Sequence, residues 1–193
     1  MQSDKFTALV RNAIGAAQSA ALAADHQKLT AEHVLAALLK DDNMTVKMLL
    51  AKAGADSASL SALLKAGLDK FPQVTGSGAG QLQLDADLAR ILAAVEAEAK
   101  ARHDQFVAVD LLLLGMTKST GSVGKILKKA GVEPAPLGAA IDEMRKGRTA
   151  DSDAAEDSYD ALSRYTSDLT EAARNGKLDP VIGRDAEVRR AVS

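Results

Sequence analysis

Lys52-Ala53-Gly54 recurs 77 residues later in the chain as Lys129-Ala130-Gly131. In both places the tripeptide follows a stretch whose apolar residues are spaced as in a helix. Glycine often ends a helix, because it adopts a positive φ without strain. The same shift of 77 residues aligns the flanking sequence without a gap, so that Leu35 meets Leu112. We therefore predict an internal duplication.

Each copy of the repeat is predicted to form four helices. Apolar residues recur at spacings of three and four, which is the pattern of a helix with one buried face. Thr30 is expected to cap the second helix, and Ser57 or Ser59 the fourth. The fold class is therefore all-α, a tandem pseudo-repeat of two four-helix units. The expected helices cover 6–24, 31–40, 46–52 and 57–70 in the first copy, and 84–95, 108–116, 123–130 and 136–146 in the second.

The chain divides into three segments by composition. Residues 1–148 hold the double-repeat domain, with repeats over about 1–75 and 80–148 joined by a glycine-rich stretch. Residues 149–158 are small, polar and acidic, without an apolar period, and are predicted to form a flexible linker. Residues 159–193 are predicted to contain one further helix and the truncated start of another module.

Composition and charge exclude several classes of function. The chain carries 24 Lys and Arg against 26 Asp and Glu, so it lacks the basic face that nucleic acid or an anionic membrane surface requires. It has no cysteine, which excludes disulfides and thiolate metal sites. Its longest apolar run, Leu111–Leu114, is far shorter than the roughly 20 residues of a membrane-spanning helix. We expect a cytoplasmic protein without nucleic-acid or membrane partners.

The sequence contains no organised motif for catalysis or metal binding. The run Ser119–Ile126 superficially resembles a phosphate loop, but it lacks the first glycine and the Ser or Thr after the lysine. The acidic run Asp151–Asp157 lacks the glycine and the final glutamate of a calcium loop. His26 and His103 are expected at equivalent repeat positions, without a convergent set of further ligands. We predict neither a catalytic nor a metal site in this chain.

Two stretches carry a resemblance to a known family. The run Gly176–Asp185, Gly-Lys-Leu-Asp-Pro-Val-Ile-Gly-Arg-Asp, resembles the opening of the first ATPase module of Clp-type AAA+ unfoldases. The junction Phe71–Gly76, Phe-Pro-Gln-Val-Thr-Gly, resembles the ClpB disaggregases within that family more than ClpA or ClpC. The two-repeat arrangement resembles the Clp N-terminal repeat domain, and the resemblance covers essentially the whole chain.

The resemblance implies a role in recognising substrate for a larger machine. It implies that the domain binds exposed hydrophobic segments of unfolded or aggregated polypeptides and passes them to a hexameric threading ring. The intact parent would be a homohexameric ATPase that uses ATP and Mg²⁺ and works with the DnaK chaperone system through a middle domain. This fragment would be monomeric, without a cofactor of its own. Val181 and Ile182 would contact adenine only in the intact ATPase module.

Five residues are expected to take part in substrate binding. By resemblance, Thr7 matches a family position linked to chaperone activity. Asp104 and Asp110 match two acidic family positions that flank the second helix of the second repeat, although Asp110 stands where the family commonly has glutamate. Ile91 and Leu111 are predicted to line an apolar groove, because four consecutive leucines exceed what one helical face can bury. Two alternatives stay open for the polar residues: Thr7 as a helix cap, and Asp110 as a carboxylate that is favourable in a first helical turn.

Two other functions fit the same sequence. The domain could dock a folded adaptor protein, as expected of the N-domains of ClpA-type or ClpC-type degradation machines. It could also be an architectural helical module that gates the ring without touching substrate. Binding of unfolded polypeptide by the isolated chain separates both alternatives from the substrate-recognition role.

Overall fold

The structure is a computed structural model that describes residues 3–41, 43–76 and 80–159. Within these ranges the regular secondary structure is almost entirely helical, with four α-helices in each repeat and two short strands, so the all-α fold class is confirmed. The elements, in chain order, are η1 Ser3–Lys5, α1 Ala8–Ala23, β1 Lys28–Leu29, α2 Ala31–Lys40, α3 Met44–Lys52, α4 Ser57–Asp69, β2 Gln83–Leu84, α5 Ala86–Ala101, α6 Val109–Thr117, α7 Ser122–Lys129 and α8 Pro134–Arg145.

The helix ends follow from local chemistry, and the predicted boundaries are close to the observed ones. Thr30 caps α2 as expected, because its hydroxyl accepts a hydrogen bond from the backbone N–H of His33. Gly54 ends α3 with a φ of +90°. The cap predicted for α4 is wrong: Asp56 takes this role, and its Oδ1 lies 3.1 Å from the N of Ser59. Either an Asp or a Ser can cap, so the sequence alone did not decide between neighbours.

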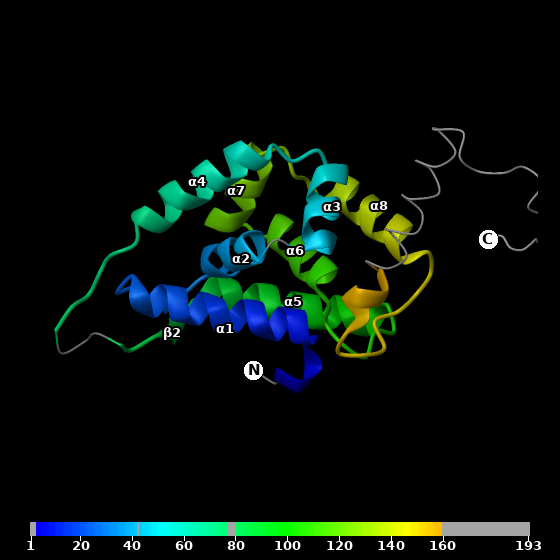
Figure 1. Cartoon of the computed structure of the whole chain (residues 1–193), viewed down its shortest axis with the longest axis horizontal. Helices are drawn as coiled ribbons and strands as arrows, with labels where there is room; N and C mark the ends of the chain where they lie inside the picture. The colour runs from blue at the N-terminus through cyan, green and yellow to red at the C-terminus, as the bar shows by residue number, and fades with distance from the viewer. Residues whose placement is uncertain (1–2, 42, 77–79, 160–193) are drawn as a thin grey trace, which may run out of the picture. The chain divides into compact units, whose positions relative to one another are not determined.

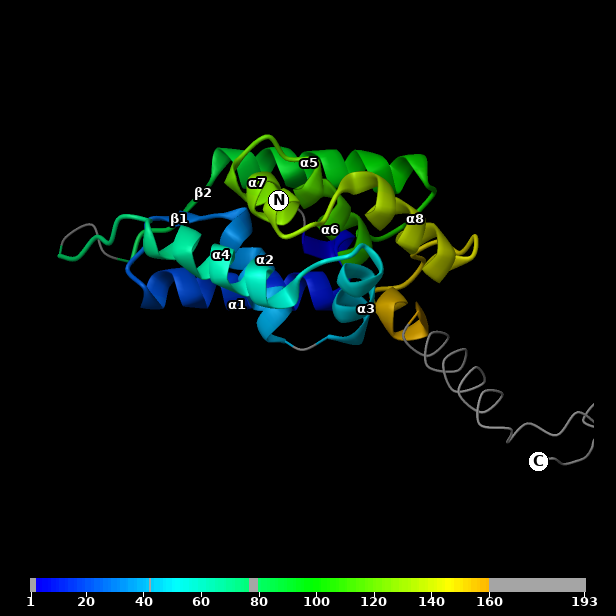
Figure 2. The same ribbon diagram turned by 90° about the horizontal axis from the view of Figure 1, so that it is seen from above.

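Two helices, α2 and α6, occupy the middle of the molecule. Figures 1 and 2 show α1 packed on α2 and α5 packed on α6, with α1 and α5 on opposite sides of the molecule in Figure 2. The core is aliphatic, and the side chains of Leu35 and Leu38 from α2 and Leu112 and Met116 from α6 are almost completely inaccessible. Full burial of such a side chain contributes about 1.5–3 kcal/mol, so these central helices supply much of the stability.

Equivalent residues of the two repeats align in a register that the sequence comparison did not predict. The N-cap residues of their first helices, Thr7 and Asp85, are 78 residues apart, whereas the glycines Gly54 and Gly131 are 77 apart. The change falls within the third helix, which has 9 residues in α3 and 8 in α7. The gapless 77-residue alignment is therefore wrong for the first two helices of the repeat.

Short extended segments cross-link the repeats. Leu29 pairs with Leu84 in the parallel β1–β2 ladder, and Phe6 forms an isolated parallel bridge with Val107. In the 78-residue register these are the same interaction made twice, because Phe6 is equivalent to Leu84 and Leu29 to Val107. Each repeat thus contributes two short extended segments to the pairing, and the two copies form one body rather than two domains.

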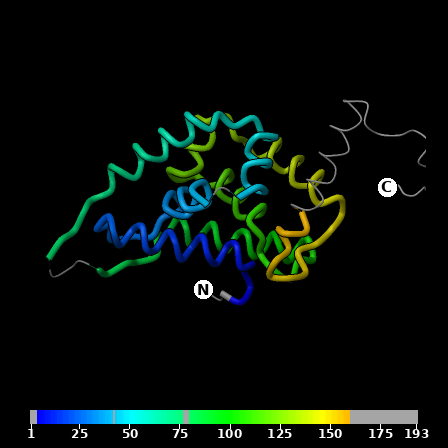
Figure 3. Tube along the Cα trace, viewed as in Figure 1, coloured from blue at the N-terminus to red at the C-terminus, as the bar shows by residue number. Residues whose placement is uncertain are grey.

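Residues 149–157 belong to this body, and we call them the exit segment. The prediction of a flexible linker is wrong for them: Ala150, Ala155 and Glu156 are buried, and the backbone oxygen of Asp153 accepts a hydrogen bond from the N of Ala8 at 2.8 Å. Figure 3 shows this part of the trace, in yellow and orange, returning to the start of α1. The small and acidic residues of this segment suggested exposure to solvent. In the structure two of its alanines are buried, and the Glu156 carboxylate accepts a hydrogen bond from a buried N–H group.

No helix within the described ranges is both long enough and apolar enough to span a lipid bilayer. Residues 155–159 are helical, so the start of the helix predicted from Tyr159 is described and its remainder lies outside the described residues. The adenine contacts predicted for Val181 and Ile182 also lie outside them.

Candidate functional site

A hollow of about 360 Å³ lies between α5 and α6. Its floor is apolar, and both residues predicted from the sequence, Ile91 and Leu111, are among the lining residues. Each is nearly inaccessible, with 3% and 1% of its surface exposed, so they form the bottom of the hollow rather than its walls. The hollow is lined by Asp87, Arg90, Ile91, Ala94, Val95, Glu98, Leu111, Leu114, Gly115, Lys118, Ser119 and Thr120.

Gly115 sets the close approach of α6 to α5 beneath this hollow. A Cβ built on Gly115 would lie 2.4 Å from Cγ1 of Val95 and 3.4 Å from Cγ2 of Ile91. Real Cβ atoms essentially never approach another carbon as closely as 2.4 Å, so a side chain here would push the two helices apart. Glycine therefore fixes the spacing of the two walls and keeps the apolar floor closed.

The rim of the hollow carries both signs of charge. Asp87 and Glu98 contribute carboxylates, and Arg90 and Lys118 contribute cations. The Asp87 carboxylate is held in place, because the hydroxyl of Ser119 donates to its two oxygens at 3.0 and 2.8 Å. An apolar floor with a rim of mixed charge suits extended polypeptide of varied sequence, since the floor takes apolar side chains and the rim faces water.

The glycines of the Ser119–Ile126 run serve packing. A Cβ on Gly121 would lie 2.5 Å from the Asp87 carboxylate, and one on Gly124 would lie 2.0 Å from the backbone oxygen of Ser119. The N–H of Gly121 donates to the Ser119 hydroxyl at 2.9 Å. A carboxylate thus lies against the loop that a phosphate would have to enter, and its negative charge opposes anion binding.

The first repeat has a matching hollow between α1 and α2, of about 380 Å³. In the 78-residue register its residues are equivalent to those of the α5–α6 hollow, with Ala13 in place of Ile91, His33 in place of Leu111 and Lys40 in place of Lys118. The sequence comparison missed this relation, because a 77-residue shift aligns Ile14 with Ile91 instead. The hollow is lined by Asn12, Ala13, Ala16, Ala20, His33, Ala36, Ala37, Lys40, Asp41 and Leu68.

The predicted site residue Thr7 lies away from both hollows and is fully buried. It caps α1, since its Oγ1 accepts from the N of Val10 at 3.3 Å. The same hydroxyl donates to Oε2 of Glu156 at 2.6 Å. The capping alternative is therefore confirmed, and the hydroxyl has a second, long-range partner in the exit segment.

Asp104 and Asp110 also lie outside the two hollows, and both bind Arg145 of α8. Nη1 of Arg145 lies 2.9 Å from both oxygens of Asp104, while Nε and Nη2 lie 2.6 and 3.0 Å from the oxygens of Asp110. The side chains of both aspartates are fully inaccessible, and that of Arg145 is 3% exposed. The shorter side chain of aspartate at position 110 thus reaches its partner with good bidentate geometry.

Thr7, Asp104, Asp110, Arg145 and Glu156 therefore form one buried cluster, which we call the exit network. Arg145 and Glu156 were missed from the sequence, since Glu156 stands in a stretch that reads as a solvated acidic run. Burial raises the pKa of Glu156; the hydrogen bonds from Thr7 and from the N of Val109 oppose this rise, and the charge of Asp110 adds to it. Thr7 contacts Glu156, Asp104 accepts from the N of Ala150, and the charge of Asp110 acts on Glu156, so the three predicted residues lie around the exit segment rather than in a groove.

Glu32 is the counterpart of Asp110 in the first repeat, since the two are 78 residues apart. It is buried at the start of α2, and burial raises its pKa, although hydrogen bonds from its own backbone and from Ser122 of α7 oppose the rise. Each repeat thus places a buried carboxyl group in the first turn of its second helix, where the helix dipole favours a negative charge.

Two histidines of the first repeat form a hydrogen-bonded pair. Nε2 of His33 lies 2.8 Å from Nδ1 of His26, and the N–H of Thr30 donates to Nδ1 of His33 at 3.1 Å. Burial lowers the pKa of His33 to about 4, and the neighbouring His26 adds to this effect. The predicted equivalence of His26 and His103 is wrong: His103, with φ of 66°, corresponds to Asp25, with φ of 60°. In the part of the chain that the structure describes, no three potential ligands gather into a metal site.

Residues 5–159 match the model of the Clp repeat (R) N-terminal domain, and the chain belongs to this family. The chain is 46% identical over 193 residues to the chaperone protein ClpB of Rhodopseudomonas palustris, covering 100% of this chain and 22% of the relative. It is likewise 46% identical to ClpB of Rhizobium meliloti, again over 22% of that protein. The chain thus spans about a fifth of the length of these relatives, and the resemblance seen in its sequence is confirmed.

Solved structures support the fold assignment. The N-terminal domain of Hsp104 from Candida albicans superimposes with a TM-score of 0.69 at 22% identity, covering 78% of this chain and 98% of that one. The N-terminal domain of the ClpV1 ATPase from E. coli gives a TM-score of 0.61 at 20% identity, covering 70% of this chain and 83% of that one. At these identities the likeness concerns the fold alone.

Proposed function

We propose that this chain is the substrate-recognition domain of an ATP-dependent disaggregase, which binds exposed hydrophobic segments of misfolded or aggregated polypeptides. The observation that carries the proposal is the α5–α6 hollow, with its apolar floor and its rim of mixed charge. The sequence relatives, which are named as ClpB chaperones, support it.

Binding at such a site is weak and tolerant of sequence. A hollow of about 360 Å³ accepts only a few side chains of an extended segment. Attachment to a larger assembly raises the effective concentration of the domain near its substrate to roughly millimolar values, which offsets weak intrinsic binding. The floor of the hollow is apolar and its charged groups lie at the rim, so we assign the domain a binding role.

The activity of the intact parent protein follows from the relatives alone. We propose a homohexameric ATPase that uses ATP and Mg²⁺, receives polypeptide from this domain and cooperates with the DnaK chaperone system. In that arrangement the domain is monomeric by itself and located in the cytoplasm. Docking of a folded adaptor protein and architectural gating of the ring are the alternatives that the test below separates from this role.

The test is an NMR titration of the 193-residue chain with an unfolded model protein and with a folded control protein. Perturbed amides that cluster on α5 and α6, with the unfolded protein only, are expected. Substitution Ala94→Glu places a charge in the apolar hollow and is expected to weaken binding at least about tenfold. Ala93→Glu on the same helix is the matched control, because Ala93 is exposed and does not line the hollow.

Three results would contradict the proposal. Equal affinity of the Ala94→Glu and wild-type chains would remove the hollow as the binding site. Binding of the folded protein alone would indicate adaptor docking, and the absence of shifts with either protein would favour an architectural role.

A further inference from the structure

One carboxylate oxygen joins three separate parts of the chain. Oε2 of Glu156 accepts a hydrogen bond from the hydroxyl of Thr7 at 2.6 Å and from the N–H of Val109 at 2.9 Å. Thr7 precedes α1, Val109 begins α6, and Glu156 stands near the end of the exit segment. Ala108, the N-cap of α6, makes no side-chain cap hydrogen bond, so Glu156 supplies from a distance what a local cap normally supplies.

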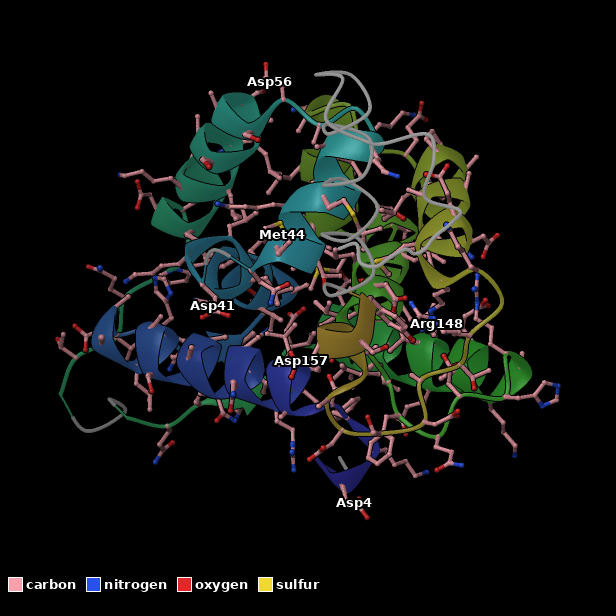
Figure 4. All side chains as sticks on the ribbon, turned by 45° about the vertical axis from the view of Figure 1, so that its right-hand side comes forward. Asp4, Asp41, Met44, Asp56, Arg148 and Asp157 are labelled. Carbon is pink, nitrogen blue, oxygen red and sulfur yellow. The ribbon has the colours of Figure 1, made fainter. Side chains whose placement is uncertain are left out.

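Backbone contacts hold the rest of the exit segment. The oxygen of Ala150 accepts from the N of Gln105 at 2.9 Å and from the N of Phe106 at 3.0 Å, and the N of Ala150 donates to Asp104 at 2.9 Å. The oxygen of Asp153 accepts from the N of Ala8. Figure 4 labels Arg148, which directly precedes the exit segment, and Asp157, its last residue.

Little apolar surface is buried within the exit segment itself. Its buried apolar residues are two alanines, Ala150 and Ala155, while Tyr159 just after the segment is also buried, with 1% of its surface exposed. An alanine side chain buries only one methyl group, so within residues 149–157 polar contacts supply most of the attachment. Among these contacts, those of Glu156 are the ones in which a buried carboxylate joins the residue before α1, Thr7, to the first residue of α6, Val109.

We propose that Glu156 is a positioning residue whose carboxylate latches the exit segment onto the N-terminal body, and that Thr7 acts through this latch rather than by touching substrate. The latch fixes the point at which the chain leaves the body. When it opens, residues 149–157 are released from the body and can extend as a tether. At about 3.3–3.6 Å for each extended residue they add roughly 30 Å of reach.

The existence of the latch does not depend on the proposed function. Its consequence does rest on that function, since a longer tether matters only if the domain delivers substrate. Its strength reflects opposing contributions. Burying a carboxylate costs free energy, which its hydrogen bonds offset, and Asp110 nearby is a like charge. A contact balanced in this way is easily shifted by a single substitution.

Hydrogen exchange of backbone amides in the 193-residue chain tests the latch without any substrate. The reporters are the amides of Ala8, Gln105 and Val109, whose acceptors lie in the exit segment. With Glu156→Ala we expect their exchange to accelerate about tenfold or more, while the amides of Leu35 and Leu49 in the core stay protected. Unchanged core protection shows that the domain remains folded.

Two matched variants make the result specific. Glu156→Gln keeps one carbonyl oxygen that can accept from both Thr7 and Val109, so it is expected to retain wild-type exchange. Asp157→Asn changes the neighbouring exposed acid and is also expected to leave the reporters unchanged. The latch is wrong if Glu156→Ala leaves the reporters protected, or if Asp157→Asn opens them equally.

A second comparison tests the role of Thr7. Thr7→Ser keeps the hydroxyl and should retain protection of Val109, whereas Thr7→Val should lose it. In the Glu156→Ala background, Thr7→Val should add nothing at Val109, because its partner is already gone. Additive effects would show that Thr7 does not act through Glu156. Polypeptide binding is measured separately with the Ala94 variants, so failure of the latch and failure of the proposed function are distinguishable.

Discussion

The guanidinium of Arg145 binds two carboxylates from different parts of the second repeat, Asp104 before α6 and Asp110 within it. Neither aspartate side chain is accessible to solvent, so both negative charges depend on this one cation and on hydrogen bonds. Removal of one partner from a buried ionic cluster leaves uncompensated charge behind, which is more harmful than loss of the contact itself.

We therefore expect Arg145→Met to lower the free energy of unfolding by about 3–5 kcal/mol, measured by urea denaturation. Arg145→Lys should recover only part of this loss, because an ammonium group cannot reproduce the two bidentate contacts. Arg90→Ala is the control: its side chain is 68% exposed and lies 3.6 Å from Asp87, and an exposed pair contributes at most about 1 kcal/mol. Similar losses for Arg145→Met and Arg90→Ala would contradict the view that the exit network is structurally important.

His33 gives the first repeat a dependence on pH. Its pKa in the folded protein is about 4, below the ordinary value of 6.5, so between these values the unfolded chain binds a proton that the folded chain does not. Stability contributed by neutral His33 is therefore present above about pH 6.5 and is lost as the pH falls toward 4. The raised pKa values of Glu32 and Glu156 act in the opposite direction, so total stability alone does not isolate this effect.

Subtracting the free energy of unfolding of His33→Gln from that of the wild type cancels the contribution of those carboxyl groups, which both proteins share. We expect the stability advantage of the wild type over this variant to shrink by about 2 kcal/mol between pH 7 and pH 5, measured by urea denaturation. His103→Asn serves as the control, since His103 is exposed and asparagine tolerates its positive φ. An advantage that stays constant with pH would show that His33 does not titrate as its burial implies.

At the scale of helices, two glycines of similar sequence context have opposite roles. Gly115 in α6 faces Val95 of α5 with no room for a methyl group, while Gly138 in α8 has no atom within 4 Å of its built Cβ. Gly115→Ala should therefore lower stability by about 1–3 kcal/mol through overpacking, despite the better helix propensity of alanine. Gly138→Ala should raise it by up to about 1 kcal/mol. Thermal unfolding of both variants checks the prediction, and equal shifts of one sign would contradict it.

Helix positions were predictable because caps and terminal glycines act locally. Thr30 and Gly54 needed only their neighbours in sequence to take their roles. The repeat register was not predictable in the same way. It depends on α7 being one residue shorter than α3, and the many alanines of the chain match one another in either register. The second hollow was hidden for the same reason, since its equivalence to the first appears only at a shift of 78.

At the scale of the whole molecule, the exit network shows where sequence reasoning stops. Ile91 and Leu111 were located at the hollow because apolar excess on a helix is a local pattern. Glu156 gave no such signal, because its importance comes from Thr7 and Val109, which lie 149 and 47 residues away in sequence. The functional roles expected of Thr7, Asp104 and Asp110 in substrate binding stay a prediction, while their contacts give all three a structural role.

The pairing between repeats predicts that neither folds alone. Phe6 pairs with Val107 and Leu29 with Leu84, while α3 packs on α8 and α4 on α7. A fragment of residues 1–76 would expose all of these surfaces, and a chain of that length buries too little apolar area to compensate. We expect fragments 1–76 and 80–193 to show little helical circular dichroism separately and to regain it on mixing, as a 1:1 complex in size-exclusion chromatography. Cooperative unfolding of fragment 1–76 by itself would show instead that the duplicated unit is an independent domain.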